Sequence, residues 1–165
     1  MMTLRPMRRS RQQLSNEECV EILERNSNGV LALTGDEGYP YAVPLSYVFK
    51  DGKIFVHSAT AGHKIDAIRR DSRASFCVID LDDVHPSTFT TIYRSVIAFG
   101  TVRIIEDEAG KRQALDDLSD KYCPDEPLTA RHAEINRSIN RLIILEMIIE
   151  AFSGKHSKEL IPLFK

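Results

Sequence analysis

Residues 41–58 read Tyr-Ala-Val-Pro-Leu-Ser-Tyr-Val-Phe-Lys-Asp-Gly-Lys-Ile-Phe-Val-His-Ser, two apolar runs on either side of an Asp-Gly pair. Asp-Gly between apolar runs is typical of two-residue hairpin turns. The runs predict strands over Tyr41–Phe49 and Ile54–Ser58, and Val30–Thr34 predicts a third strand that ends at the turn 35–38. Three strands with short connections predict an antiparallel meander, which disfavours a doubly wound fold with helices between parallel strands.

Helical signals flank this region. Ser15 and Glu18 match a capping box and predict a helix over Asn16–Arg25. After Gly62 the apolar spacing becomes helical up to Arg70. The same reasoning predicts helices over Asp107–Tyr122 and Thr129–Ser138, and strands over Ala74–Leu81, Ser95–Ile105 with a bend at Gly100, and Arg141–Phe152.

These elements define one α+β domain over residues 15–165, with about six antiparallel strands and flanking helices. Strands this evenly spaced favour a barrel that leaves no edge exposed. Residues 1–14 form a basic arm, since four arginines precede the first acidic residue, Glu17. No apolar face accompanies these arginines, so the arm is read as a solvated or subunit-docking extension rather than as a phosphate- or lipid-binding segment.

The composition excludes several functional classes. A net charge of -2 gives no overall attraction to nucleic acid. No apolar run approaches the roughly 20 residues that span a bilayer, and no secretory signal is recognised, so no membrane partner is expected. The three cysteines are widely separated and are read as reduced thiols of a cytoplasmic protein. The five histidines lack metal-ligand spacing, so no metal site is expected.

Residues 57–64, His-Ser-Ala-Thr-Ala-Gly-His-Lys, join a predicted strand to a predicted helix. Unpaired amides at a helix N-terminus favour anions, the hydroxyls of Ser58 and Thr60 can donate to phosphate oxygens, and Lys64 adds a full charge. The segment therefore indicates an anion site, with a plain surface turn as the alternative. The glycine-rich nucleotide motifs, the H-E-x-x-H zinc motif and the G-x-S-x-G hydrolase motif are absent.

Three motifs occur together: Y-P-x-x-x-P-L-x-Y at 39–47, D-G-K-I-x-x-H at 51–57, and G-H-K at 62–64. In this combination, with weaker support from 93–96 and 153–155, the chain resembles the nitroimidazole-resistance proteins within the pyridoxamine 5'-phosphate oxidase-like FMN-binding split barrels. The resemblance covers most of the chain. It implies an antiparallel split β-barrel that binds FMN as a homodimer, with each FMN held between two subunits.

The resemblance also implies a set of cofactor contacts. The segment 44–46 would lie along the isoalloxazine ring and offer backbone groups to its polar edge, while the segment 57–64 would hold the phosphate. Histidine stands at 63 where the oxidase branch has an arginine; it is the single catalytic residue expected, with a phosphate or structural contact as the open alternative. The implied cofactor-binding residues are Pro44, Leu45, Ser46, His57, Ser58, Ala59, Thr60, His63 and Lys64.

The resemblance favours an FMN-dependent oxidoreductase that reduces a nitro group or another small electron-poor substrate. Val43 stands where the oxidase branch has an arginine, which argues against pyridoxamine phosphate oxidation. A flavin-, haem- or deazaflavin-binding module without turnover and a cofactor-free dimeric domain are the alternatives. Strand 141–152 and the segment 93–95 would supply the second subunit's wall, with Arg94 either a contact across the interface or an exposed charge.

Overall fold

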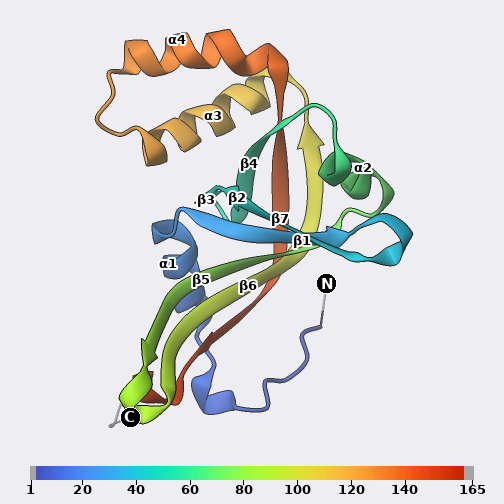
Figure 1. Ribbon diagram of the computed structural model, residues 1–165. Helices are drawn as coiled ribbons and strands as arrows, with labels where there is room; N and C mark the ends of the chain where they lie inside the picture. The colour runs from blue at the N-terminus through green and yellow to red at the C-terminus, as the bar shows by residue number, and fades with distance from the viewer. Residues whose placement is uncertain (1–2, 162–165) are drawn as a thin grey trace.

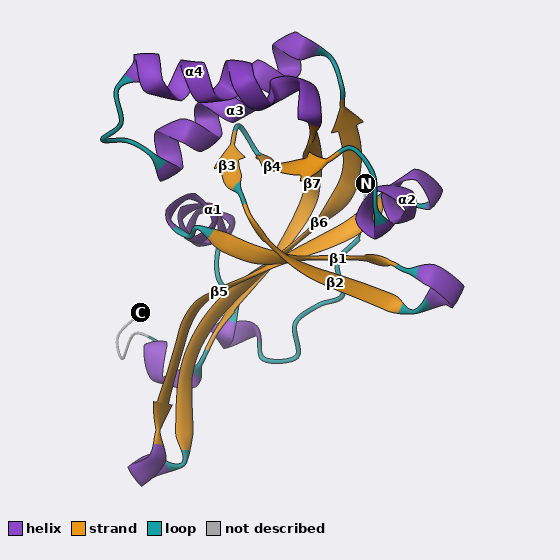
Figure 2. Ribbon diagram, turned by 45° about the horizontal axis from the view of Figure 1, so that its top comes forward, coloured by secondary structure: helices purple, strands orange, loops and turns teal. Residues whose placement is uncertain are grey.

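The computed structural model describes residues 3–161, over which seven antiparallel strands form one sheet with four α-helices around it (Figure 1). The strands are β1 (Asn28–Thr34), β2 (Pro40–Ser46), β3 (Val48–Lys50), β4 (Lys53–Ala59), β5 (Arg73–His85), β6 (Thr90–Ile105) and β7 (Leu142–His156). The helices are α1 (Asn16–Arg25), α2 (His63–Arg70), α3 (Glu108–Tyr122) and α4 (Leu128–Ser138). The α3–α4 hairpin covers one end of the sheet, and the long β5–β6 hairpin extends from the other (Figure 2).

The strand order is β2-β1-β5-β6-β7-β4-β3, with every adjacent pair antiparallel. The predicted split barrel is confirmed, with seven strands in place of about six. The expected meander is wrong, because β2 and β3 lie at opposite edges of the sheet although one residue separates them. The expectation of a barrel without exposed edges is wrong for the same reason: β2 and β3 do not pair with each other.

Tyr47 is the residue that breaks the predicted strand 41–49. Its side chain is fully buried, donates to the Leu23 carbonyl over 2.7 Å and meets the Phe76 ring edge-on. Its backbone amide donates to the Tyr122 hydroxyl at 2.9 Å, and that hydroxyl donates to the Tyr47 carbonyl at 2.8 Å. Both backbone groups are therefore satisfied outside a β-ladder, which allows the chain to leave one edge of the sheet and begin the other.

The local signals in the sequence otherwise match the structure. Ser15 and Glu18 form both hydrogen bonds of the capping box. Asp51 and Gly52 have φ of 50° and 73°, as a hairpin turn of type I′ requires. The register of β6 against β7 shifts at Gly100, where a Cβ would lie 1.9 Å from the Ile148 carbonyl oxygen. Glycine is therefore required there for the close approach of two backbones.

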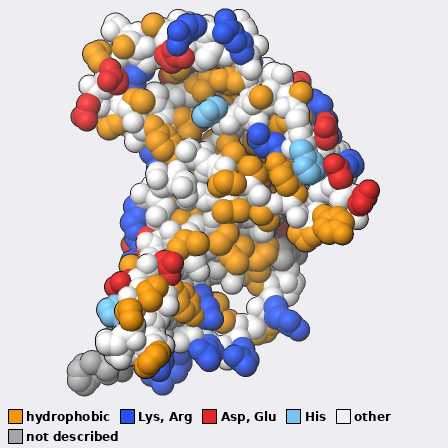
Figure 3. Space-filling model, viewed as in Figure 1, with side chains coloured by type: hydrophobic (Ala, Val, Ile, Leu, Met, Phe, Trp, Pro, Cys, Tyr) orange, Lys and Arg blue, Asp and Glu red, His pale blue; other side chains and the backbone are white. Residues whose placement is uncertain are grey.

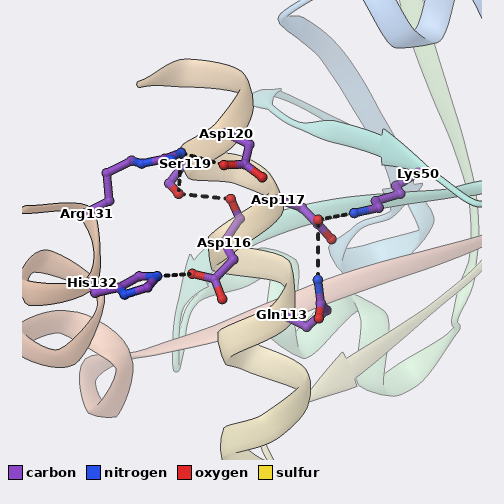
Figure 4. A network of polar contacts seen from close by, with 8 residues as sticks. All are labelled: Lys50, Gln113, Asp116, Asp117, Ser119, Asp120, Arg131 and His132. Atoms are coloured by element: carbon purple, nitrogen blue, oxygen red, sulfur yellow. Dashed lines mark hydrogen bonds and ion pairs between the residues drawn. The ribbon is translucent and has the colours of Figure 1, made fainter. Parts of the chain in front are cut away.

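Two apolar clusters stabilise the fold. The larger fills the barrel between the inner faces of the strands and the helices α1 and α2. The smaller lies under the α3–α4 hairpin, where Leu115 and Ile135 pack with Ile144 of β7. A polar network surrounds it, in which Lys50 at the end of β3 contacts Asp117 of α3 (Figure 4). The helical hairpin is thus attached to the barrel by both apolar packing and an ion pair.

Asp80 is the extra residue of a β-bulge in β5 and links three elements. The β5–β6 register shifts around it, and its buried carboxylate accepts hydrogen bonds from Arg25 and Asn26 at the end of α1. Arg94 of β6 donates to the same carboxylate at 2.5 Å. Arg94 is therefore an internal ion-pair partner, which corrects the reading of this residue as a solvated charge.

The end of the basic arm packs against its own chain. Gln12 and Leu14 are buried, and the Leu14 amide donates to the Gly154 carbonyl of β7. Gln12 and Leu14 are therefore not solvated, whereas the arginines of the arm are exposed, as the sequence pattern predicts.

Candidate functional site

The junction of β4 and α2 has the geometry of an anion site. Gly62 precedes α2 with φ of 126°, a conformation that favours glycine, and its carbonyl accepts from the amides of Ile65 and Asp66. No side chain caps the helix. The first amides of an α-helix have no intrahelical partner, so the start of α2 presents free donors and the positive end of the helix dipole.

Ser58 and Lys64 add side-chain donors at this junction. Ser58 is the last inward-facing residue of β4, and its buried Oγ has no hydrogen-bond partner. A buried hydroxyl without a partner costs about 1–3 kcal/mol, so it is suited to a ligand oxygen. Lys64 is half-buried, and none of the described carboxylates lies within 4.0 Å of its ammonium group. The donor set of this junction therefore fits a phosphate group.

His63 is held against the β1–β2 hairpin. Its ring stacks on Tyr41 of β2, with 4.0 Å between ring centroids, and its Nε2 lies 3.5 Å from Oδ2 of Asp36. Arg70 donates to Oδ1 of Asp36 at 2.7 Å. This hydrogen bond is the main cause of a lowered Asp36 pKa, so the carboxylate stays ionised at neutral pH. Tyr41 and Asp36 thus contact His63 from the β1–β2 hairpin, and Arg70 holds Asp36.

The strand pleat separates some residues that the sequence places in one site. In β4, Ser58 faces the barrel interior while His57 and Ala59 are exposed on the other face. In β2, Leu45 packs against the main core while Pro44 and Ser46 are exposed. Successive side chains of a strand point to opposite faces. The side chains of His57 and Ser58 therefore cannot both reach the same ligand atom, whereas the backbone groups of 44–46 are independent of this alternation.

Tyr41 connects the two halves of the predicted cofactor site. It contacts His63 at the start of α2, and Pro44 lies three residues further along β2, about 10 Å away at the usual rise of a strand. The far end of β2 is fixed by Tyr122 of α3, whose hydroxyl donates to the carbonyls of Ser27 and Tyr47. β2 therefore begins beside the segment expected to hold the phosphate and contains, at its other end, the segment expected to contact the ring.

Sequence reasoning missed Asp36, Tyr41 and Tyr122 as site residues. The sequence places Asp36 only in the turn 35–38 and Tyr122 only at the end of a predicted helix. Tyr41 lies inside the 39–47 motif but received no role. The motif was the one available signal for Tyr41, because an aromatic residue two positions from the end of a hairpin strand has no distinctive chemistry of its own.

Two further features bear on the class of site. Within residues 3–161, no group of three or more His, Cys, Asp and Glu side chains is arranged to hold a metal ion. None of the helices described there is long and apolar enough to cross a bilayer.

Several solved structures share this fold. A conserved hypothetical protein from Mycobacterium tuberculosis has a TM-score of 0.80 at 19% identity over 94% of this chain and 92% of its own. A candidate 5-nitroimidazole antibiotic resistance protein from Bacteroides thetaiotaomicron has a TM-score of 0.72 at 21% identity, covering 87% and 86%. An FAD-binding protein from Mesorhizobium loti has a TM-score of 0.63 at 26% identity, covering 89% and 98%.

Among curated proteins, none is significantly similar to the chain in sequence. A family model, described as pyridoxamine 5'-phosphate oxidase, matches residues 15–156. This match spans every strand and every α-helix of the fold. The resemblance indicated by the motifs at 39–47, 51–57 and 62–64 is confirmed, and the chain belongs to the pyridoxamine 5'-phosphate oxidase family.

Proposed function

We propose that the protein binds FMN and uses it as an oxidoreductase that reduces a nitro group or a similar small electron-poor substrate. The observation that carries the proposal is the β4–α2 junction, where an unpaired buried hydroxyl, an uncapped helix start and an unpaired lysine meet. These donors suit a phosphate with two ionised oxygens. FMN is the flavin that ends in such a group.

The known relatives support a flavin and a nitro substrate. This fold family includes flavin-binding proteins, among them the FAD-binding protein from Mesorhizobium loti. The Bacteroides thetaiotaomicron structure is named for resistance to 5-nitroimidazoles. In this chain Val43 packs partly buried against the main core, so it offers no charge to a substrate phosphate. Pyridoxamine phosphate oxidation is therefore not proposed.

In such a reaction the protein would bind the flavin and orient its ring. Lys64, Ser58 and the first amides of α2 would bind the phosphate, and the backbone of 44–46 would contact the polar edge of the ring. FMN bound here would supply two electrons, taken from a nicotinamide nucleotide or a separate reductase, and these with two protons would convert a nitro group to a nitroso group and water. His63, at the start of α2, would donate one of these protons.

A test of the function compares His63→Ala with the parent after anaerobic reduction of bound FMN. On addition of a nitroimidazole, the parent should lose the reduced-flavin spectrum, and His63→Ala should do so about 100-fold more slowly, because general acid catalysis contributes about that factor. His132→Ala is the matched control, since His132 is an exposed histidine on α4 whose Nε2 lies 3.7 Å from Oδ1 of Asp116. A reduced flavin that no electron-poor compound reoxidises would favour a binding module without turnover.

We propose a homodimer with FMN near the interface. On β5 and β6, Phe76, Val78, Val96 and Ala98 face the core, so Cys77, Ile97 and Phe99 face outward, where they are only half-buried. Figure 3 shows hydrophobic side chains gathered across the centre of the molecule, over β1, β5 and β6. A contiguous apolar sheet face of this kind is suited to a second copy of the chain.

Light scattering of Ile97→Glu tests the proposed interface. We expect the parent to have twice the mass of one chain and the variant to dissociate at least about 100-fold more readily, since a buried unpaired carboxylate costs several kcal/mol. Leu128→Glu is the control, because Leu128 is 60% exposed on α4, away from this face. Dimers of unchanged stability in Ile97→Glu would place the interface elsewhere.

We also propose a cytoplasmic location. Cys19, Cys77 and Cys123 are all free thiols, and burial raises the pKa of the first to about 11. Thiols persist where the surroundings are reducing, as in the cytoplasm.

A further inference from the structure

The His63 ring is fixed on its Nε2 side. Oδ2 of Asp36 lies 3.5 Å from Nε2, and a Cβ built on Gly35 would also lie 3.5 Å from Nε2. Both neighbours belong to the turn between β1 and β2. Nε2 therefore faces this turn, and Nδ1 is the ring nitrogen that no described contact occupies.

Tyr41 and Asp36, which contact the His63 ring, are each fixed by a further contact. Tyr41 is half-buried against the main core, so the surface on which the imidazole stacks is fixed by packing. Asp36 uses its two oxygens separately: Oδ1 accepts from Arg70 at 2.7 Å, and Oδ2 faces His63. Arg70 is seven residues after His63 in α2, two turns along the same helix face. The row Arg70–Asp36–His63 is thus anchored at both ends by α2.

We propose that Asp36 is a positioning residue that keeps the proton of the neutral His63 ring on Nε2 and leaves Nδ1 to face a ligand. A neutral imidazole has one donor and one acceptor nitrogen. The negative charge of Asp36, 3.5 Å from Nε2, favours the proton on that nitrogen, which makes Nδ1 the acceptor. An acceptor is a poor partner for a phosphate, which presents only acceptor oxygens when fully ionised. His63 in this state can take up a proton at Nδ1 and then pass it to a substrate as a general acid, and the phosphate is left to Lys64 and Ser58.

This inference rests on the proposed function for the identity of the ligand, but the tautomer is a property of the protein alone. The first experiment therefore uses flavin-free protein labelled with ¹⁵N-histidine. Nuclear magnetic resonance at a pH where His63 is neutral should show the proton on Nε2 in the parent. Asp36→Ala should give a mixture of both tautomers, and Asp36→Asn, whose amide oxygen can still accept, should largely retain the Nε2 form.

Asp66→Ala is the matched control, because it removes an exposed carboxylate from the first turn of the same helix. Its His63 tautomer should equal that of the parent. Asp36 is itself exposed, so Asp36→Ala should fold, and Asp36→Asn keeps the shape of the side chain. A His63 tautomer that is the same in Asp36→Ala as in the parent overturns the proposal, whether or not the protein binds a flavin.

The second experiment measures ligand binding in the loaded protein. His63→Ala should change the affinities for FMN and for riboflavin, which lacks the phosphate, by the same factor. Asp36→Ala should lower the rate of flavin reoxidation by a nitroimidazole about tenfold with FMN affinity within twofold of the parent. An effect of His63→Ala confined to FMN would overturn the assignment of His63 to the substrate. If the tautomer shifts as expected but no flavin binds, the proposed function fails and the positioning role of Asp36 stands.

Discussion

Replacing Lys64 with methionine is expected to weaken FMN binding by about 10–100-fold. The substitution keeps the length of the side chain and removes its charge. A hydrogen bond to a charged group contributes about 1.5–3 kcal/mol, and each 1.4 kcal/mol is a factor of ten in the dissociation constant. Riboflavin should bind equally well to Lys64→Met and to the parent, because it lacks the phosphate. Fluorescence quenching of both ligands measures the two constants directly.

Lys158→Met serves as the control, since this lysine lies near the end of the chain and has Glu159 as its ion-pair partner. It should bind both ligands as the parent does. Ser58→Ala gives a second arm: it removes the unpaired hydroxyl, so it should weaken FMN binding while leaving the flavin-free protein as stable as the parent or more so. Equal FMN affinity in Lys64→Met and the parent would show that the phosphate does not lie at the start of α2.

Replacing Asp80 with asparagine is expected to destabilise the protein and to remove part of its acid sensitivity. Burial raises the pKa of Asp80, but hydrogen bonds from Arg25, Asn26 and Arg94 outweigh it and lower the pKa to about 2. The carboxylate side chain is 4% exposed, so solvent screening is small. The lowering of the Asp80 pKa from 3.8 to about 2 corresponds to about 2 kcal/mol of stability at neutral pH.

The direction of the pH dependence follows from the lower pKa of Asp80 in the folded state. The folded protein holds Asp80 ionised more firmly than the unfolded chain does, so its contribution is complete above about pH 4. It is lost as the pH falls from about 4 to about 2. Urea unfolding at pH 7 and pH 2.5 should therefore show a gap of about 2 kcal/mol between parent and Asp80→Asn that narrows at the lower pH. Asp125→Asn, at an exposed position between α3 and α4, is the control and should show no gap at either pH.

Local patterns predicted the bounds of the helices to within one residue, but β5, β6 and β7 each extend four or five residues beyond one end of the predicted strands 74–81, 95–105 and 141–152. The capping box at Ser15 starts α1 at the expected residue, and the Asp51-Gly52 pair forms the expected turn. These features depend on hydrogen bonds and dihedral angles within a few residues. The pairing of strands depends on long-range contacts instead. No local signal indicated that the run 41–49 is divided at Tyr47, because the partners of Tyr47 come from α1, β5 and α3.

For the candidate site too, local features were predictable from the sequence and long-range contacts were not. The segment 58–64 was predicted as an anion site from its composition, and the structure adds an unpaired hydroxyl at Ser58 and an uncapped helix. The burial of Asp80 beneath two arginines was not predicted, because a carboxylate in a strand gives no sign of a bulge. The environment of His63 was not predicted either, since Asp36 and Tyr41 precede it by more than twenty residues.

The amino-acid sequence alone predicted the strand-turn-helix order and the residue types that suit a phosphate, because these follow from spacing and side-chain chemistry, and its three motifs indicated the family by resemblance. The tertiary structure decided which edge each strand occupies, which face Ser58 and His57 take, and which nitrogen of His63 is occupied. Those outcomes depend on contacts between α2 and the β1–β2 hairpin, and on Tyr47 at the boundary of two edges. Residues distant in the chain meet only when the sheet and helices pack around the core, so their chemistry is a property of the fold.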